Sequence, residues 1–424
     1  MLEKRKPLQV RDAQRMMLEH AASLHTEWLP LEKAAGRVLA EDVTADAAVP
    51  PFDRSPYDGY AVRAEDTKGA GRDTPVHLQI LETIGAGSVP DKEVTPGTAS
   101  RIMTGAMIPS GADAVIMLEQ TSNDTSGEMA VYRECAAGEN IVRKASEMAE
   151  GEVVVTKGTT VHPGVTAVLA AFGHSRVLVR RRPRIGVIAT GTELLEPHEA
   201  LETGKIRNSN AYMVLHQLAE AGAETVYLGK LDDDLPSAVR STGDALESVD
   251  ALITTGGVSV GDFDFLPEVY KQLGADVLFN KIAMRPGSVT SAAVIGKKVL
   301  FGLSGNPSAC FVGFELFAGP WIRASQGDEA PYLQKGRAVL GEDFSKPNPF
   351  TRFIRGTFHD SGSTVCVPAG MDKSQAVTTL AHTSILIVLP GGTRGYQKGD
   401  EVDILYLHSS GSQEPLHPEK RAGS

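Results

Sequence analysis

The sequence predicts a multidomain protein of the α/β plus β class. We expect a three-layer α/β domain with a mostly parallel sheet, a β-rich inserted domain, an N-terminal helical and extended domain, and a C-terminal β domain. The 424 residues are too many for one ordinary core. Between residues 183 and 330, strand-like runs alternate with helical patterns, which is typical of a parallel sheet covered on both faces. Short extended runs between turn residues precede and follow that region.

Composition and charge are those of a globular protein, with 42% hydrophobic and 22% charged residues. The net charge of −11 argues against a nucleic-acid partner, because such proteins usually carry a basic patch. Cys135, Cys310 and Cys366 show neither metal-ligand spacing nor a disulfide framework, which favours a reducing compartment. The sequence shows no signal-peptide pattern and no apolar run near the ~20 residues of a membrane span. We therefore expect a cytoplasmic protein with no nucleic-acid or membrane partner.

Changes of pattern along the chain mark the expected domains. The basic run Arg180-Arg181-Arg182 before Pro183 indicates a boundary, and such a run is usually a solvated linker. The expected ranges are 1–48 with 153–182 for the N-terminal domain, 49–152 for the β-rich insertion, 183–330 for the α/β domain, 331–408 for the C-terminal β domain and 409–424 for a polar, disordered tail.

The N-terminal domain is expected to be mainly helical and then extended. Apolar residues recur at helical spacing from Val10 to Leu24. Pro30 and Gly36 can open and close a second short helix. The apolar stretch 165–172 has a helical pattern, and we expect it to pack on these first helices.

Three predicted strands of the α/β domain end in similar polar turns. In the turn after Ala251-Leu252-Ile253, two adjacent glycines let the backbone approach a ligand closely. Asn306 suits an N-cap and Pro307 a first helical turn, so a helix from Ser308 is expected to present free N–H groups. Ligands on parallel sheets bind beyond the carboxyl ends of the strands, which predicts an anionic ligand here. The three turns are Thr190-Gly191-Thr192-Glu193, Thr254-Thr255-Gly256-Gly257 and Ser304-Gly305-Asn306-Pro307.

Acidic side chains also follow predicted strands of this domain, at Glu193, Asp264 and the run 232–234. Oxygen ligands beside phosphate groups suit Mg²⁺. Helix capping is the alternative explanation of the run, and Asp234 has the position of a cap. Lys281 and Arg285 lie four apart in a predicted extended stretch and so share a face. They either meet an anion together or are solvated at the surface.

Polar turns of the β-rich insertion, at Asp58-Gly59 and Thr104-Gly105, are explained by turn chemistry alone. In combination with the α/β turns, however, they carry a resemblance. The chain closely resembles the molybdopterin molybdenumtransferase family, known as MoeA in bacteria and as the E-domain of gephyrin in animals. The resemblance covers residues 1–408, and its motifs occur in family order. They are Asp58-Gly59-Tyr60-Ala61-Val62, Thr104-Gly105-Ala106, Gly111-Ala112-Asp113-Ala114-Val115, Thr190-Gly191-Thr192-Glu193-Leu194, Ser209-Asn210, Gly256-Gly257-Val258-Ser259-Val260-Gly261, Arg285-Pro286-Gly287 and Gly305-Asn306-Pro307.

The resemblance implies an enzyme of molybdenum cofactor biosynthesis. Family members insert molybdenum from molybdate into adenylylated molybdopterin and release AMP, with a divalent cation. They are homodimers whose active site lies between the α/β domain of one subunit and the insertion of the other. Handover of substrate from a molybdopterin adenylyltransferase is expected.

By motif position, the resemblance also implies roles for particular residues. Asp58, from the partner subunit, would orient the attacking oxygen. Lys281 and Arg285 would bind molybdate or offset phosphate charge. The backbone N–H groups of Gly256, Gly257 and Ser259, and of the helix opening at Ser308, would hold the pterin phosphate or the diphosphate link. Catalytic roles fall on Asp58, Thr104, Glu193, Asp233 and Asp264, with Mg²⁺ on Glu193, Asp233 and Asp264, and substrate binding on Gly256, Gly257, Ser259, Lys281, Arg285, Ser304, Gly305, Asn306, Pro307 and Ser374.

Three departures from the family pattern bear on these roles. Ser288-Val289 stand where many relatives have Lys-Pro, so one cation is lost. Ser304 replaces a common proline. Ala145-Ser146-Glu147 replace Gly-Glu-Asp, and loss of the glycine can alter the turn. Two other functions remain open at this point: a scaffold protein of the same fold, and an adenylyltransferase that consumes ATP with free molybdopterin.

Overall fold

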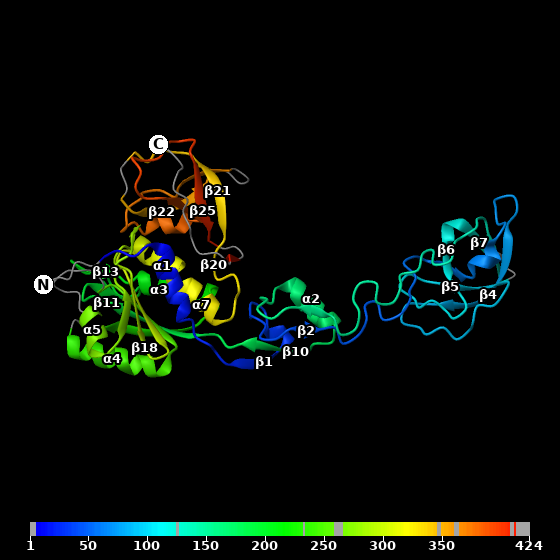
Figure 1. The fold of residues 1–424 in the computed structure, drawn as a ribbon, viewed down its shortest axis with the longest axis horizontal. Helices are drawn as coiled ribbons and strands as arrows, with labels where there is room; N and C mark the ends of the chain where they lie inside the picture. The colour runs from blue at the N-terminus through cyan, green and yellow to red at the C-terminus, as the bar shows by residue number, and fades with distance from the viewer. Residues whose placement is uncertain are drawn as a thin grey trace. The chain divides into compact units, whose positions relative to one another are not determined.

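The computed structural model of the chain describes residues 6–123, 127–231, 234–257, 266–345, 349–359, 364–407 and 411–412. The chain divides into two compact bodies (Figure 1). The first comprises residues 1–41, 158–163 and 176–424, and the second comprises residues 42–157 and 164–175. Within the described ranges, no helix has the length and apolar character that a bilayer crossing requires.

A six-stranded sheet lies at the centre of the first body. Strands β14, β11, β15 and β19 run parallel in that spatial order, and β18 and then β16 each join antiparallel to the preceding neighbour. The mostly parallel sheet expected from the sequence is confirmed. The strands are β11 (Arg184–Thr190), β14 (Glu224–Leu231), β15 (Ala251–Thr255), β16 (Asp276–Phe279), β18 (Ser291–Ile295) and β19 (Lys298–Leu303).

Helices cover both faces of this sheet (Figure 1). Neighbouring residues of a strand point to opposite faces, so Val187 is buried with α1, α3, α6 and α7, whereas Ile188 is buried with α4 and α5. The expected three-layer arrangement is therefore confirmed. The helices are α1 (Val10–Glu19), α3 (Asn210–Glu220), α4 (Leu235–Ser248), α5 (Leu266–Gln272), α6 (Pro307–Gly313), a π-helical turn η4 (Phe314–Ala318) and α7 (Gly319–Ser325).

Helix α1 packs on the α/β domain, although the sequence pattern assigned it to a separate N-terminal domain. Its buried residues Val10, Ala13 and Met17 belong to the same apolar cluster as the sheet. The helix ends at Glu19, short of the Leu24 to which the apolar pattern extends. Beyond it, the Ala22 amide donates to Ser325 Oγ of α7 at 2.9 Å and not to a helix carbonyl.

Three further elements differ from expectation or extend it. The predicted second helix is a single 3₁₀ turn, η1 (Leu31–Lys33). Strand β1 (Thr26–Pro30) pairs antiparallel with β10 (Arg176–Arg180) in the first body. Helix α2 (Pro163–Ala171), expected to pack on the first helices, belongs instead almost entirely to the second body.

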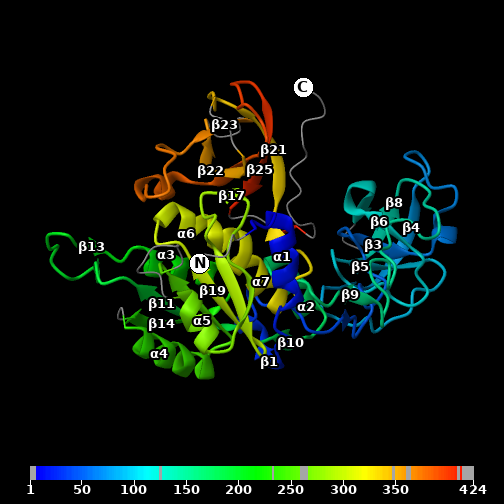
Figure 2. The same cartoon turned by 60° about the vertical axis from the view of Figure 1, so that its left-hand side comes forward.

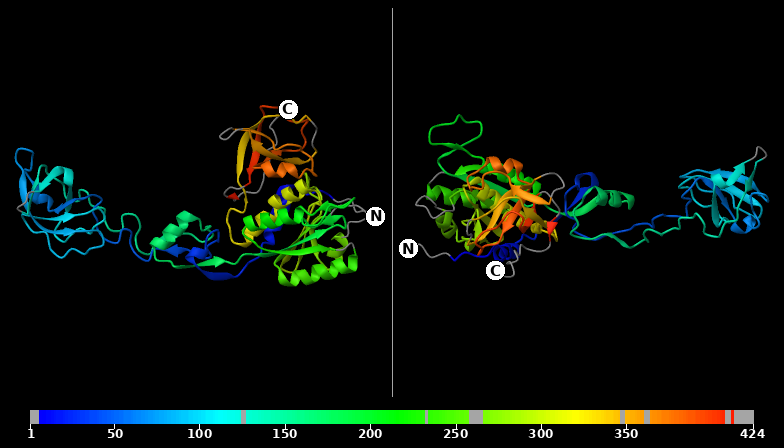
Figure 3. Two further views of the ribbon diagram at one scale, coloured as in Figure 1. Left: turned by 180° about the vertical axis from the view of Figure 1, so that it is seen from behind. Right: turned by 90° about the horizontal axis from the view of Figure 1, so that it is seen from above.

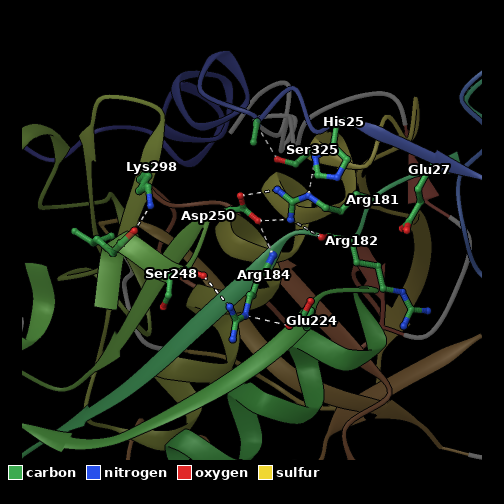
Figure 4. A network of polar contacts seen from close by, with 12 residues as sticks. His25, Glu27, Arg181, Arg182, Arg184, Glu224, Ser248, Asp250, Lys298 and Ser325 are labelled. Atoms are coloured by element: carbon green, nitrogen blue, oxygen red, sulfur yellow. Dashed lines mark hydrogen bonds and ion pairs between the residues drawn. The ribbon is translucent and has the colours of Figure 1, made fainter. Parts of the chain in front are cut away.

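The basic run before Pro183 is held to the α/β domain by an ion pair, and is not the solvated linker expected (Figure 4). Arg181 donates through both terminal guanidinium nitrogens to the two oxygens of Asp250, at 2.7 and 2.8 Å. Asp250 also accepts the Arg184 backbone amide at 2.7 Å, so one carboxylate ties the start of β11 to the start of β15. Burial alone would raise the pKa of Asp250, but these hydrogen bonds hold it below its ordinary value.

The C-terminal strands form a closed barrel on the α/β domain. Strands β22, β23, β21, β25 and β24 pair in that order, and β24 pairs again with β22 to close the ring. Strand β17 (Met284–Arg285) comes from the α/β domain and pairs with the start of β22. The barrel strands are β21 (Lys335–Leu340), β22 (Thr351–Phe358), β23 (Val365–Pro368), β24 (Ile385–Leu389) and β25 (Glu401–Tyr406), with a 3₁₀ helix η5 (Thr378–His382). Strands β20 (Tyr332–Leu333) and β26 (Gly411–Ser412) form a separate antiparallel pair.

The second body is built on a six-stranded sheet in the order β6-β3-β5-β4-β8-β7. Apolar clusters lie on both of its faces, because Tyr60 and Val62 of β3 belong to one cluster and Ala61 to the other. Strands β2 and β9 form a separate pair. The elements are β2 (Val43–Thr44), β3 (Gly59–Val62), η2 (Ala64–Thr67), β4 (Val76–Ile84), β5 (Thr98–Ile102), β6 (Ala114–Met117), η3 (Leu118–Gln120), β7 (Thr121–Asn123), β8 (Glu128–Val131) and β9 (Val153–Val155).

Candidate functional site

A cavity of about 1060 Å³ lies at the carboxyl ends of β11, β15 and β19 in the first body. All three polar turns predicted from the sequence line it. Parallel strands end at the same edge of a sheet, which is why turns distant in sequence meet there. The lining residues are in segments 190–194, 206–210, 255–257, 285–289 and 304–307, with Ala309 and, from the barrel, Arg352, Asp372 and Ser374.

Close packing of two turns requires glycine at position 256. Gly256 has a φ of +97°, and a Cβ there would lie 2.7 Å from the Thr190 hydroxyl oxygen and 2.8 Å from the Thr190 carbonyl oxygen. The Gly256 amide donates to the Leu303 carbonyl oxygen at 2.8 Å, extending the pairing of β15 and β19. This amide is therefore not free for a phosphate, contrary to the expectation from the sequence.

The first turn of α6 is capped by the barrel, which corrects a second expectation. The Ser308 amide donates to the Ser374 carbonyl oxygen at 3.0 Å, and the buried Ser308 hydroxyl donates to the Ala376 carbonyl oxygen at 2.7 Å. Asn306 occupies the N-cap position, but its side chain makes no capping hydrogen bond. The Ser308 N–H group is not free for an anion, because the loop that carries Ser374 occupies it.

The barrel contributes a charged pair, Arg352 and Asp372, that sequence reasoning missed. The two side chains form an ion pair, and Asp372 also lies 3.6 Å from the buried Arg355. Burial lowers the pKa of Arg355, and the nearby Asp372 carboxylate opposes that shift. No local signal marks Arg352, since its place depends on the pairing of Arg285 in β17 with Arg352 in β22.

The structure does not bring Lys281 and Arg285 to the cavity together. Exposed Arg285 lines it, but Lys281 is not among its described lining residues. The intervening stretch is not uniformly extended, because the Ile282 amide donates to the Ser288 carbonyl oxygen at 2.8 Å and the Met284 amide to the Ile282 carbonyl oxygen at 2.9 Å. The four-residue spacing therefore does not give the two cations a common face.

Of the acids expected to hold Mg²⁺, only Glu193 can be placed. Its exposed side chain lines the cavity and lies beside Gly191. Asp233, Asp264 and the proposed phosphate ligand Ser259 lie outside the described residues. Among the residues that are described, no cluster of three His, Cys, Asp or Glu side chains is arranged for a metal ion. Asp234 caps α4 as expected, accepting the Ser237 amide at 2.9 Å.

A further cation that sequence reasoning did not single out is Arg207. It lines the cavity from β13 (Ile206–Arg207), which pairs with β12 (Leu194–Leu195). The signal available in the sequence was the alternation of Lys205 and Arg207 just before the Ser209-Asn210 motif. Two cations separated by one residue share a face of an extended segment.

The second body holds Asp58 and Thr104 together. Gly59 pairs with Ile102 across β3 and β5, which brings the flanking turns side by side. The amide and the hydroxyl of Thr104 donate to one oxygen of Asp58, at 2.7 and 2.8 Å. The Asp58 side chain is exposed, and these hydrogen bonds, first from the amide and then from the hydroxyl, lower the pKa of Asp58.

Family models match the chain in three consecutive segments. The MoeA N-terminal region (domain I and II) matches residues 8–173. A probable molybdopterin binding domain matches residues 186–324, which include the three turns of the cavity. The MoeA C-terminal region (domain IV) matches residues 337–407 and so spans most of the barrel.

Known proteins are similar over nearly the whole chain. A molybdopterin molybdenumtransferase of Bacillus subtilis is 53% identical over 418 residues, which are 98% of this chain and 97% of the relative. A Staphylococcus aureus molybdopterin molybdenumtransferase is 47% identical over 417 residues, 98% and 99% of the two chains. The crystal structure of a molybdopterin biosynthesis MoeA protein from Pyrococcus horikoshii is similar with a TM-score of 0.82 at 32% identity, covering 95% of this chain and 100% of that one.

Proposed function

The chain belongs to the molybdopterin molybdenumtransferase family, and from this premise we propose that it inserts molybdenum from molybdate into adenylylated molybdopterin and releases AMP. It would thus be a transferase of molybdenum cofactor biosynthesis, acting in the cytoplasm. The observation that carries the proposal is the cavity of about 1060 Å³ at the strand ends of the domain that matches the molybdopterin-binding model. Its volume is at the upper end of the range of about 300–1,000 Å³ that small-molecule and cofactor sites have.

Anionic groups of the substrate are the parts that this cavity is best equipped to hold. Arg285 lines it, and so does Arg352, which is ion-paired with Asp372. A guanidinium group binds phosphate or an oxyanion through two parallel hydrogen bonds. Ser374 adds a polar side chain beside them. Because the amides of Gly256 and Ser308 are already occupied, side chains rather than these two amides would supply most of the anion contacts.

Mg²⁺ is the divalent cation in the proposal. Glu193 would hold it with Asp233 and Asp264, and carboxylate oxygens beside phosphate are the donors this ion prefers. The exposed position of Glu193 in the cavity wall fits such a role. The bound ion would neutralise charge on the diphosphate link. Replacement of Glu193 by Gln should then raise the Mg²⁺ concentration needed for half-maximal AMP release.

A homodimer completes the proposal, with Asp58 and Thr104 of one subunit serving the cavity of the other. The support is that two hydrogen bonds from Thr104 fix an exposed carboxylate on the surface of the insertion, where it is open to a second subunit. A molybdopterin adenylyltransferase would supply the substrate. Mixing an inactive Asp58→Ala variant with the Glu193→Gln variant, at an Mg²⁺ concentration too low to activate the latter, should restore part of the activity, because mixed dimers regain one complete site. Mixtures that stay inactive would contradict the shared site.

The deciding experiment is AMP release by the purified protein from adenylylated molybdopterin and Mg²⁺, with and without molybdate. Molybdate-dependent release with formation of active cofactor is the expected result. Consumption of ATP with free molybdopterin would identify an adenylyltransferase instead. Tight binding of substrate without release would identify a binding protein.

A further inference from the structure

Residues 191–209 form an arm that leaves the sheet after β11 and returns at the start of α3. It projects from the α/β domain near the label β13 in Figure 2 and is visible in green in the right-hand view of Figure 3. Its base is closed by backbone hydrogen bonds, from the Ile206 amide to the Glu193 carbonyl oxygen at 2.9 Å and from the Asn208 amide to the Leu195 carbonyl oxygen at 2.7 Å. The base therefore has a fixed position beside the cavity.

Side chains secure the same base. The Lys205 ammonium group donates to the Thr192 carbonyl oxygen of the cavity turn. The Asn208 side chain donates to the Tyr227 hydroxyl at 3.0 Å, and that hydroxyl donates to the Glu196 carboxylate at 2.7 Å. These contacts fix both strands of the arm against β14.

Arg207 is the cation of this base that lines the cavity. It lies two residues after Lys205, hence on the same side of the extended segment, and it lines the cavity while remaining exposed. Its hydrogen bond to the Glu199 carbonyl oxygen is long, at 3.4 Å. Across the described parts of the chain, no carboxylate forms an ion pair with Arg207 or Arg285, whereas Arg352 is paired with Asp372.

We propose that Arg207 is a phosphate-binding residue that selects ligands carrying a phosphoryl group. Arg207 comes from the arm and Arg285 from β17, so two unpaired guanidinium groups enter one cavity from separate segments. A diphosphate link between two heterocycles is the chemistry that two such groups suit. The inference deepens the proposed function, on which it rests for the identity of the natural ligand.

The test is calorimetric titration of the full chain with two probes, AMP and pyrophosphate. Replacing Arg207 by Gln should weaken both by roughly tenfold or more, as loss of a charge-assisted hydrogen bond does. Arg207→Lys should recover part of the affinity, because lysine keeps the positive charge but cannot form the two parallel hydrogen bonds of a guanidinium group. Arg240→Gln is the matched control, since Arg240 is exposed on α4 and does not line the cavity. It should bind both probes like the wild type.

The outcomes separate this inference from the proposed function. Wild-type affinity in the Arg207→Gln variant, with molybdate-dependent AMP release intact, would overturn the role of Arg207 and leave the function standing. Failure of the wild-type protein to bind either probe would also overturn the role of Arg207, whereas the proposed function is decided by AMP release. Arg207→Gln could also unfold at a lower temperature than the wild type. In that case the two variants Arg207→Gln and Arg207→Lys are compared at a temperature where both are folded. A larger loss of affinity in Arg207→Gln then supports the role of Arg207, and equal losses overturn it.

Discussion

Both hydrogen-bond donors of Thr104, its backbone amide and its hydroxyl, point to the same oxygen of Asp58, at 2.7 and 2.8 Å. The Asp58 carboxylate is exposed, so these two bonds and not burial determine its orientation. Thr104 thus holds the Asp58 carboxylate in place, and the catalytic role that the family resemblance implies for both residues stays a prediction.

Replacing Thr104 by Val should raise the pKa of Asp58 toward its ordinary value. The substitution removes the hydroxyl donor to the charged form and keeps the amide. We expect AMP release to fall on the order of tenfold, the effect of one lost hydrogen bond to a charged group. Carboxyl NMR titration measures the pKa, and Thr104→Ser is the control that should retain both values. An unchanged pKa together with lost activity would mean that Thr104 acts on the substrate directly.

Replacing Ala145 by Gly should stabilise the second body. Ala145 adopts a φ of +60°, so the turn survives the loss of the family's glycine at the cost of a left-handed backbone. That conformation destabilises an L-residue by about 1–2 kcal/mol in the folded protein. Glycine removes this strain, but its greater conformational entropy in the unfolded chain lowers the stability by about 0.4–1 kcal/mol. A net gain of about 0.5–1 kcal/mol follows. Hydrogen exchange of residues 49–152 should slow, whereas Ser146→Gly should not slow it.

Replacing Gly256 by Ala should cost more stability than the same change at another glycine of positive φ. Alanine at either position lowers the stability by about 1–2 kcal/mol, because an L-residue is strained in the left-handed backbone conformation. At Gly256 the new Cβ must also displace Thr190, whereas at Gly229, with φ of +83°, no atom lies within 4 Å. Urea unfolding followed by the fluorescence of buried Trp321 gives the two costs. Only Gly256→Ala should also weaken AMP binding. Equal losses of unfolding free energy in the two variants would show that Thr190 moves away from the new Cβ without a loss of stability.

Replacing Asp250 by Asn should destabilise the first body by about 1–3 kcal/mol, because a partly buried, hydrogen-bonded carboxylate loses its charge. The folded-state pKa of Asp250 is lowered. Its contribution is therefore complete above the unfolded pKa of ~3.9 and is lost as the pH falls further through the folded value. Trp321 unfolding curves at pH 7 and at about pH 2–3, below the unfolded pKa, should show the difference in unfolding free energy between the two proteins shrinking. A constant difference across that range would contradict the ion pair as its source.

Local patterns were enough to predict the alternation of strands and helices in the α/β domain and the edge of the sheet at which the cavity lies. Alternating strands and helices with their cap residues specify a parallel sheet, and Asp234 caps α4 as its position indicated. Turn residues after Thr190, Thr255 and Leu303 lie at strand ends, which a parallel sheet brings to one edge. Such signals depend on a few neighbouring residues, so they can be read from the sequence without knowledge of tertiary contacts.

Tertiary structure alone decided which groups in that cavity are available. The amides of Gly256 and Ser308 are taken by Leu303 and by the barrel loop at Ser374. Arg352 enters because β22 pairs with β17, and Arg207 because β13 pairs with β12. The sequence by itself determined turns and strand ends, because these depend on neighbouring residues. It could not determine these partners, because each depends on packing and pairing between segments far apart in the chain.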